Sequence, residues 1–69
     1  MDARNVVQVQ ICGHTYTIKG EANQEYILGV AAYVDLKMRE VMDKLPVASP
    51  SKVAILASLN IADELFKER

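Results

Sequence analysis

The spacing of hydrophobic positions predicts a β-hairpin over about residues 4–20. Apolar and polar residues alternate on both sides of a Gly-His dipeptide, as is typical of strands with one buried face. The apolar positions are Val7, Val9, Ile11, Tyr16 and Ile18. With Gly13 first in a two-residue loop, we expect a type II′ turn. That turn pairs Ile11 with Tyr16 and leaves all five apolar side chains on one face of the hairpin.

A period of three to four residues replaces the alternation farther along and predicts a helix over about residues 23–45. Asn23 suits the N-cap of this helix, and Pro46 ends it. One side of the helix is apolar, through Ile27, Val30, Val34, Met38, Val41 and Leu45. The other side is predicted to face solvent and carries Asp35, Lys37, Arg39, Glu40, Asp43 and Lys44.

A second helix is predicted over about residues 50–69. Ser49 suits its N-cap and Pro50 its first position. The first half of this helix is apolar on every side, whereas from Ile61 onward only one side is apolar, and Asn60 marks the change. The four-three-four spacing of a coiled-coil seam is shared by Ile55, Leu59, Ala62 and Phe66. We therefore expect a helix that begins inside a core and ends as the start of a coiled coil.

The length of the chain indicates one domain that associates with a partner. We expect residues 1–69 to form a single domain, with 51% hydrophobic residues in only 69 positions. Such a short domain buries about 60% of its unfolded surface and generally depends on disulfides, a metal or a partner chain. A single cysteine, Cys12, excludes a disulfide within the chain, and Cys12 with His14 supplies too few ligands for zinc. Self-association is the remaining route to stability.

Charge and hydropathy argue against two classes of partner. The formal net charge of −1 provides no basic stripe for nucleic acid. No stretch approaches the roughly 18 consecutive apolar residues of a membrane helix, and no signal peptide opens the chain. We therefore expect a cytosolic protein in a reducing environment, without membrane contact and without a cofactor.

Candidate catalytic groups are few. Cys12 and His14 flank a tight turn with no fixed acid nearby in the sequence, so we expect no catalysis there, although His14 at an exposed turn suits recognition. Asp63 and Glu64 are adjacent on a helix and point in different directions, so they form no carboxylate pair. The amide of Asn60 has two interpretations: a ligand-binding group, or a hydrogen-bonding group toward the interhelix connector or a partner chain, which we favour.

Three segments of the sequence resemble the ZapA family of cell-division proteins. They are residues 9–18 (VQICGHTYTI), residues 31–35 (AAYVD) with the Lys-Met pair that follows, and residues 56–65 (LASLNIADEL). The third segment is close to the family's A-A-L-N-I-A-x-E-L pattern and is the most specific. Ser58 stands where the family commonly has alanine, which exchanges one small residue for another. The resemblance covers essentially the whole chain.

The resemblance implies a fold, an assembly and a function. ZapA-like proteins have an α+β head of β-β-α-α order whose second helix continues into a coiled coil. Their heads form intertwined homodimers, and the full coiled coils pair dimers into tetramers. They bind FtsZ in the cytoplasm at the mid-cell division site, cross-link its protofilaments and are not enzymes. Because this sequence stops about where the coiled coil should begin, we expect a head that dimerises with the coiled-coil extension largely absent.

The resemblance also suggests contact residues. The family's FtsZ surface is attributed to charged residues of the head, and the matching positions here are His14, Lys44 and Lys52, to which we add Arg39 on the polar side of the first helix. For the dimer and core we expect a separate, largely apolar set: Ile11, Tyr16, Val34, Ile55, Leu59, Asn60, Ile61 and Phe66. From the residue pattern alone, a generic homodimerisation module without FtsZ contact remains the alternative.

Overall fold

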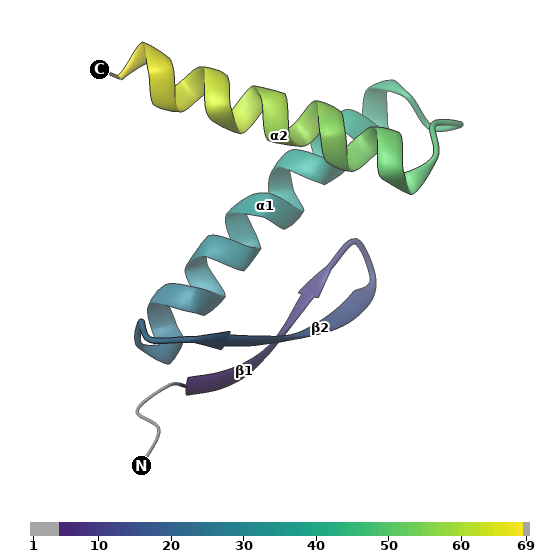
Figure 1. Cartoon of the computed structure of the whole chain (residues 1–69). Helices are drawn as coiled ribbons and strands as arrows, with labels where there is room; N and C mark the ends of the chain where they lie inside the picture. Colours follow the sequence, from purple (N-terminus) through teal and green to yellow (C-terminus); the bar gives the residue numbers. More distant parts are fainter. Residues whose placement is uncertain (1–4, 69) are drawn as a thin grey trace. The chain divides into compact units, whose positions relative to one another are not determined.

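The computed structural model describes residues 5–68 and consists of a hairpin followed by two helices (Figure 1). The elements are β1 (Asn5–Ile11), β2 (His14–Gly20), α1 (Gln24–Lys44) and α2 (Pro50–Lys67). The predicted α+β class and β-β-α-α order are thus confirmed. The chain forms two compact units, one up to Asp35 and one from Leu36, and α1 contributes to both. The single domain over residues 1–69 stays a prediction.

The hairpin turn is formed by Cys12 and Gly13, so the predicted type II′ turn is wrong. Both residues have positive φ, 52° and 82°, which is the combination that a type I′ turn requires. Because the loop begins one residue earlier than expected, Ile11 pairs with His14 instead of Tyr16. The register therefore differs from the predicted one by two residues. An even shift leaves every side chain on its predicted face of the hairpin.

The core of the first unit lies between the hairpin and the first half of α1. Val7 and Val9 of β1 are each 3% exposed, and Ala31 of α1 is 9% exposed. Ile11 and Ile27 pack against these three residues at the edge of the cluster. The alternation of β1 therefore places its apolar side chains against α1, as period-two patterning requires.

Both predicted N-caps are confirmed. The side-chain oxygen Oδ1 of Asn23 accepts a hydrogen bond from the backbone N–H of Tyr26 at 2.8 Å. At the start of α2, Oγ of Ser49 accepts from the N–H of Lys52 at 3.2 Å, and Pro50 occupies the first turn. Each cap satisfies an N–H group that has no partner inside its helix.

The second unit consists of α2 packed on the second half of α1. Val53 and Ala57 of α2 are 2% and 1% exposed, and Val41 of α1 is 7% exposed. Partly buried side chains around them are Met38, Ala48 and Leu56. One face of the apolar half of α2 is thus buried within its own chain. Over residues 5–68, neither helix combines the length and apolar character that crossing a bilayer demands.

Candidate interaction surfaces

The α2 helix carries a second apolar face, roughly opposite the face that packs on α1. On a helix with about 100° per residue, four residues fall on this side, and together we call them the α2 ridge. They are Ile55, Leu59, Ala62 and Phe66. The structure leaves Ile55 62%, Leu59 61% and Phe66 71% exposed. A continuous apolar row of this kind, unlike a single exposed leucine, indicates an interaction surface.

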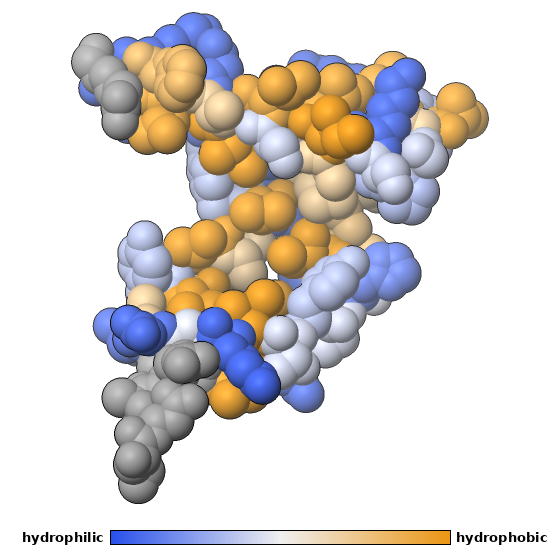
Figure 2. Space-filling view, viewed as in Figure 1, coloured by the Kyte–Doolittle hydropathy of each residue, from blue (hydrophilic) through white to orange (hydrophobic). Residues whose placement is uncertain are grey.

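A second apolar surface lies within the first unit, where α1 and the hairpin enclose a groove of about 260 Å³. We call it the hairpin groove. Its lining residues are Val9, Ile11, Ile18, Tyr26, Ile27, Val30, Ala31 and Val34. In the view of Figure 2, hydrophobic side chains reach the surface along the helices and over the hairpin region. The chain therefore exposes apolar surface in both of its units.

The predicted dimer residues fall into three groups. Ile11 and Val34 are half-buried and line the hairpin groove, whereas Ile55, Leu59 and Phe66 lie on the α2 ridge. The remaining three, Tyr16, Asn60 and Ile61, line neither surface.

Those three residues have different surroundings. Tyr16 is 48% exposed, and its ring lies edge-on to the imidazole of His14 with centroids 6.5 Å apart. Asn60 is exposed on α2, and Ile61 beside it is half-buried. Their role in a dimer stays a prediction, as does the hydrogen-bonding partner expected for the Asn60 amide.

The four predicted FtsZ-contacting residues are all exposed. His14 follows the hairpin turn in the first unit, and the three cations belong to the second unit. Lys44 is in the last turn of α1, and Lys52 is in the first turn of α2. These two lysines flank the five-residue connector 45–49, and we call Lys44 and Lys52 together the connector surface. Arg39 lies five residues before Lys44 on α1.

The two residues considered as candidate catalytic groups lie at the hairpin turn, Cys12 within it and His14 at the first position of β2. Cys12 is half-buried and His14 is exposed. Within residues 5–68, no group of three or more His, Cys, Asp or Glu side chains is placed to hold a metal ion.

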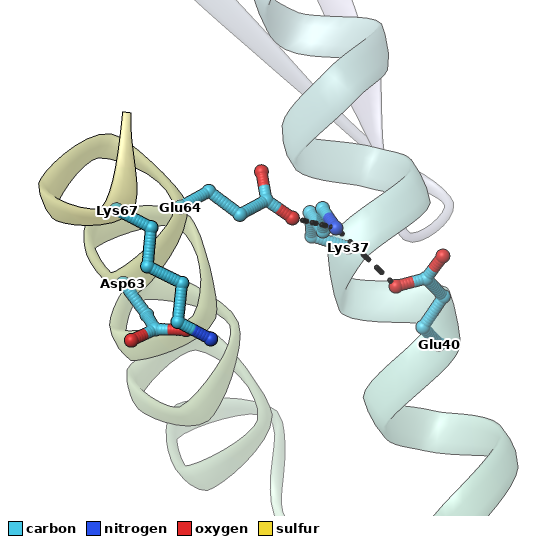
Figure 3. Close-up of polar contacts among 5 residues, drawn as sticks. All are labelled: Lys37, Glu40, Asp63, Glu64 and Lys67. Atoms are coloured by element: carbon cyan, nitrogen blue, oxygen red, sulfur yellow. Dashed lines mark hydrogen bonds and ion pairs between the residues drawn. The ribbon is translucent and has the colours of Figure 1, made fainter. Parts of the chain in front are cut away.

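Two polar residues that the pattern assigned to the solvent side of α1 are instead half-buried. Asp35 accepts a hydrogen bond from the backbone N–H of Cys12 through Oδ1 at 2.7 Å, which ties α1 to the hairpin turn. The ammonium group of Lys37 contacts the carboxylate of Glu64 on α2, and Glu40 lies 3.7 Å from the same nitrogen (Figure 3). Both residues flank the apolar stripe of α1. Their position beside the apolar stripe is the feature of the sequence from which these contacts could have been expected.

Comparisons with known proteins agree with this fold. The sequence model of the family described as Cell division protein ZapA matches residues 7–69. Cell division protein ZapA of Geobacillus thermodenitrificans is 44% identical over 61 residues, which cover 88% of this chain and 67% of that protein. Its counterpart in Halalkalibacterium halodurans is 39% identical over 59 residues, covering 86% of this chain and 65% of that protein.

A solved structure gives the same result in three dimensions. It is described as a ZapA mutant dimer from Geobacillus stearothermophilus, and it is 39% identical to this chain. The two structures align with a TM-score of 0.77 over 97% of this chain and 78% of the solved one. Sequence and fold therefore agree that the chain belongs to the ZapA family of cell division proteins.

Proposed function

We propose that the chain is a non-enzymatic regulator of cell division that binds FtsZ in the cytoplasm at mid-cell and promotes protofilament cross-linking and Z-ring assembly. The observation that carries this proposal is the match of the ZapA family over residues 7–69. The mechanism is avidity: a symmetric assembly presents the same binding surface twice, so that one assembly holds two filaments. With the full coiled coil, dimers would join into tetramers and separate the two binding ends further.

A homodimer is the assembly unit of the proposal. Among residues 5–68, only six hydrophobic residues are buried, whereas fifteen large ones are exposed. A chain of this length with so small a core is marginal alone and gains stability by burying that surface against a second copy. The related chain from Geobacillus stearothermophilus is described as a dimer, which supports the same assembly here.

The connector surface is the proposed contact with FtsZ. Lys44 and Lys52 are exposed on either side of a short connector whose Val47 is 98% exposed. Complementary charges on a protein surface raise the association rate and make binding sensitive to salt. His14 and Arg39 extend the proposal to the hairpin turn and the polar side of α1.

The test is co-sedimentation of the chain with FtsZ polymers at low and high salt. We expect the chain to pellet with the polymers, and we expect Lys44→Glu with Lys52→Glu to abolish most of that pelleting. The change at Lys52 places an acid three residues after the Ser49 cap, the capping-box arrangement, so the helix start is preserved. Loss of pelleting would therefore report on binding, with circular dichroism to confirm the fold.

The matched control is Lys19→Glu with Lys67→Glu, which changes the net charge equally at exposed positions outside the connector surface. This control should pellet like the unchanged chain. Unchanged pelleting of the connector double variant would contradict the assigned surface. If the unchanged chain does not pellet at all while it still dimerises, the alternative of a generic homodimerisation module is favoured.

A further inference from the structure

The connector between α1 and α2 presents one apolar side chain almost entirely to solvent. Val47 is 98% exposed, the highest value among the large hydrophobic residues that the structure describes. Single exposed apolar residues are normal on protein surfaces, so exposure alone does not mark a site. At Val47, the backbone and the neighbouring charges provide two further observations.

The first observation is that Val47 is held at the tip of an ordered turn. The N–H of Ala48 donates to the carbonyl of Leu45 at 3.0 Å, which closes a four-residue turn with Pro46 and Val47 at its centre. Proline is favoured at the second position of such a turn because its ring fixes φ near −65°. Ala48 is half-buried and packs against the core cluster of the second unit. The position of Val47 is therefore fixed before binding, which lowers the cost of ordering it in a complex.

Valine is also an unusual residue for the third position of this turn. Turns are dominated by Gly, Pro, Asn, Asp and Ser, whereas β-branched residues favour strands. Val47 departs from this preference although it buries almost none of its surface within the chain. Departures from local preference without a gain in packing are expected at functional sites. We therefore expect Val47 to act through contact with another molecule.

The second observation is that the charges beside Val47 are of one sign. Lys44 lies three residues before it and Lys52 five residues after it, with no charged residue between the two lysines. Asp43 precedes Lys44 directly but lies about 100° away from it around α1. Interfaces often have an apolar centre that is desolvated and a polar rim. An apolar tip between two lysines thus fits an apolar pocket bordered by carboxylates.

A protein pocket suits this tip better than a membrane. Even a whole myristoyl chain gives only marginal membrane binding, and one valine buries far less apolar surface. Segments that recognise anionic lipids usually cluster about 4–8 Lys or Arg residues. Between Leu45 and Ser49 the connector has none, and only Lys44 and Lys52 flank it closely. A shaped pocket, in contrast, can obtain a large share of its binding energy from one central side chain.

We propose that Val47 is the apolar anchor of the contact that the connector surface makes with FtsZ, and that it inserts into an apolar pocket bordered by acidic side chains. This inference rests on the proposed function and specifies the residue that gives the contact its specificity. Lys44 and Lys52 lie at the rim, where charges guide association and are screened by salt. Val47 lies at the centre, where the apolar contact does not depend on screening.

Val47→Thr tests the anchor with the smallest change of shape. Threonine keeps the β-branched outline but exchanges a methyl group for a hydroxyl, which an apolar pocket leaves without a hydrogen-bond partner. In co-sedimentation with FtsZ polymers, the apparent Kd should rise at least ~10-fold, at low and at high salt alike. Val47→Ile keeps an apolar, β-branched side chain and should pellet nearly as well as the unchanged chain.

Val6→Thr is the matched control. Val6 is a 65% exposed valine on β1 in the first unit, and threonine suits a strand. The same exchange there should leave the apparent Kd unchanged. Salt gives a further distinction, because the loss caused by Lys44→Glu with Lys52→Glu should be largest at low salt. The loss caused by Val47→Thr should persist at both salt concentrations.

The outcomes separate the anchor from the function on which it rests. Weaker pelleting of Val47→Thr at both salt concentrations, with Val47→Ile and Val6→Thr unaffected, supports the proposal. If Val47→Thr pellets like the unchanged chain, the anchor is overturned while the lysine contact with FtsZ stands. If the unchanged chain does not pellet with FtsZ at all, both the anchor and the proposed function fail.

Two further measurements examine the other possible occupants. A rise in the dimer dissociation constant of Val47→Thr in sedimentation equilibrium would show that Val47 contacts a second copy, which overturns the proposal. Pelleting of the unchanged chain, but not of Val47→Thr, with phosphatidylserine vesicles would assign Val47 to a membrane surface and overturn it as well. We expect neither, so both variants should dimerise equally and leave such vesicles unbound.

Discussion

At the scale of single residues, the hairpin turn stores strain at Cys12. This residue has a φ of 52°, which residues with a β-carbon adopt at a cost and which asparagine tolerates better. Asn-Gly is the preferred pair for a type I′ turn. We therefore expect Cys12→Asn to raise the free energy of unfolding by about 0.5–1 kcal/mol. Urea denaturation at a fixed chain concentration measures this change.

The control for that prediction is Cys12→Ala, which removes the sulfur but keeps the β-carbon and its strain. It should be no more stable than the unchanged chain. If Cys12→Asn and Cys12→Ala unfold at the same urea concentration, the strain argument is wrong.

The same turn shows what the residue pattern could and could not predict. Alternation identified which side chains share a face, but it is blind to an even shift of register, so the turn type was wrong. The caps at Asn23 and Ser49 were predictable because they depend on residues three positions away. Asp35 contacts Cys12, which is 23 positions away in the sequence, and no local pattern contains that information.

At the scale of elements, the contact between Lys37 and Glu64 fixes α2 against α1. The side chain of Lys37 is only 14% exposed, whereas that of Glu64 is 38% exposed. Removing the acid leaves a mostly buried ammonium group with a weaker neighbour in Glu40, so Glu64→Ala should destabilise the chain by about 1–2 kcal/mol. Lys37→Met keeps an apolar stem on the α1 stripe and should cost less. Thermal unfolding of the two variants compares them.

A neighbouring ion pair provides the control for this prediction. Lys67 and Asp63 lie 3.0 Å apart on α2, and their side chains are 75% and 60% exposed. Exposed pairs contribute little, so Asp63→Ala should change stability by less than about 0.5 kcal/mol. Equal losses for Asp63→Ala and Glu64→Ala would show that helix propensity, and not the contact with α1, determines both values.

The two faces of α2 explain why the first half of this helix has apolar residues on every side. Val53 and Ala57 are buried against α1, while Ile55 and Leu59 remain exposed on the α2 ridge. The sequence pattern indicated that every side of the first half of α2 would be buried. It could not show which face is covered within the chain and which is left over, because that depends on where α1 lies. The candidate site thus became visible only as the surface that folding of one chain does not bury.

At the scale of the whole molecule, stability and assembly should be coupled. Fifteen large hydrophobic side chains are exposed among residues 5–68, and if a dimer covers part of them, dimerisation contributes to the stability of the fold. A 100-fold increase in chain concentration should then stabilise the dimer by about 2.7 kcal/mol and raise Tm by about 5–10 °C. Phe66→Ala should lower Tm most at low concentration, and Val47→Ala should follow the unchanged chain. Differential scanning calorimetry across that range measures the effect, and a Tm independent of concentration would mean that one chain is stable without its partner.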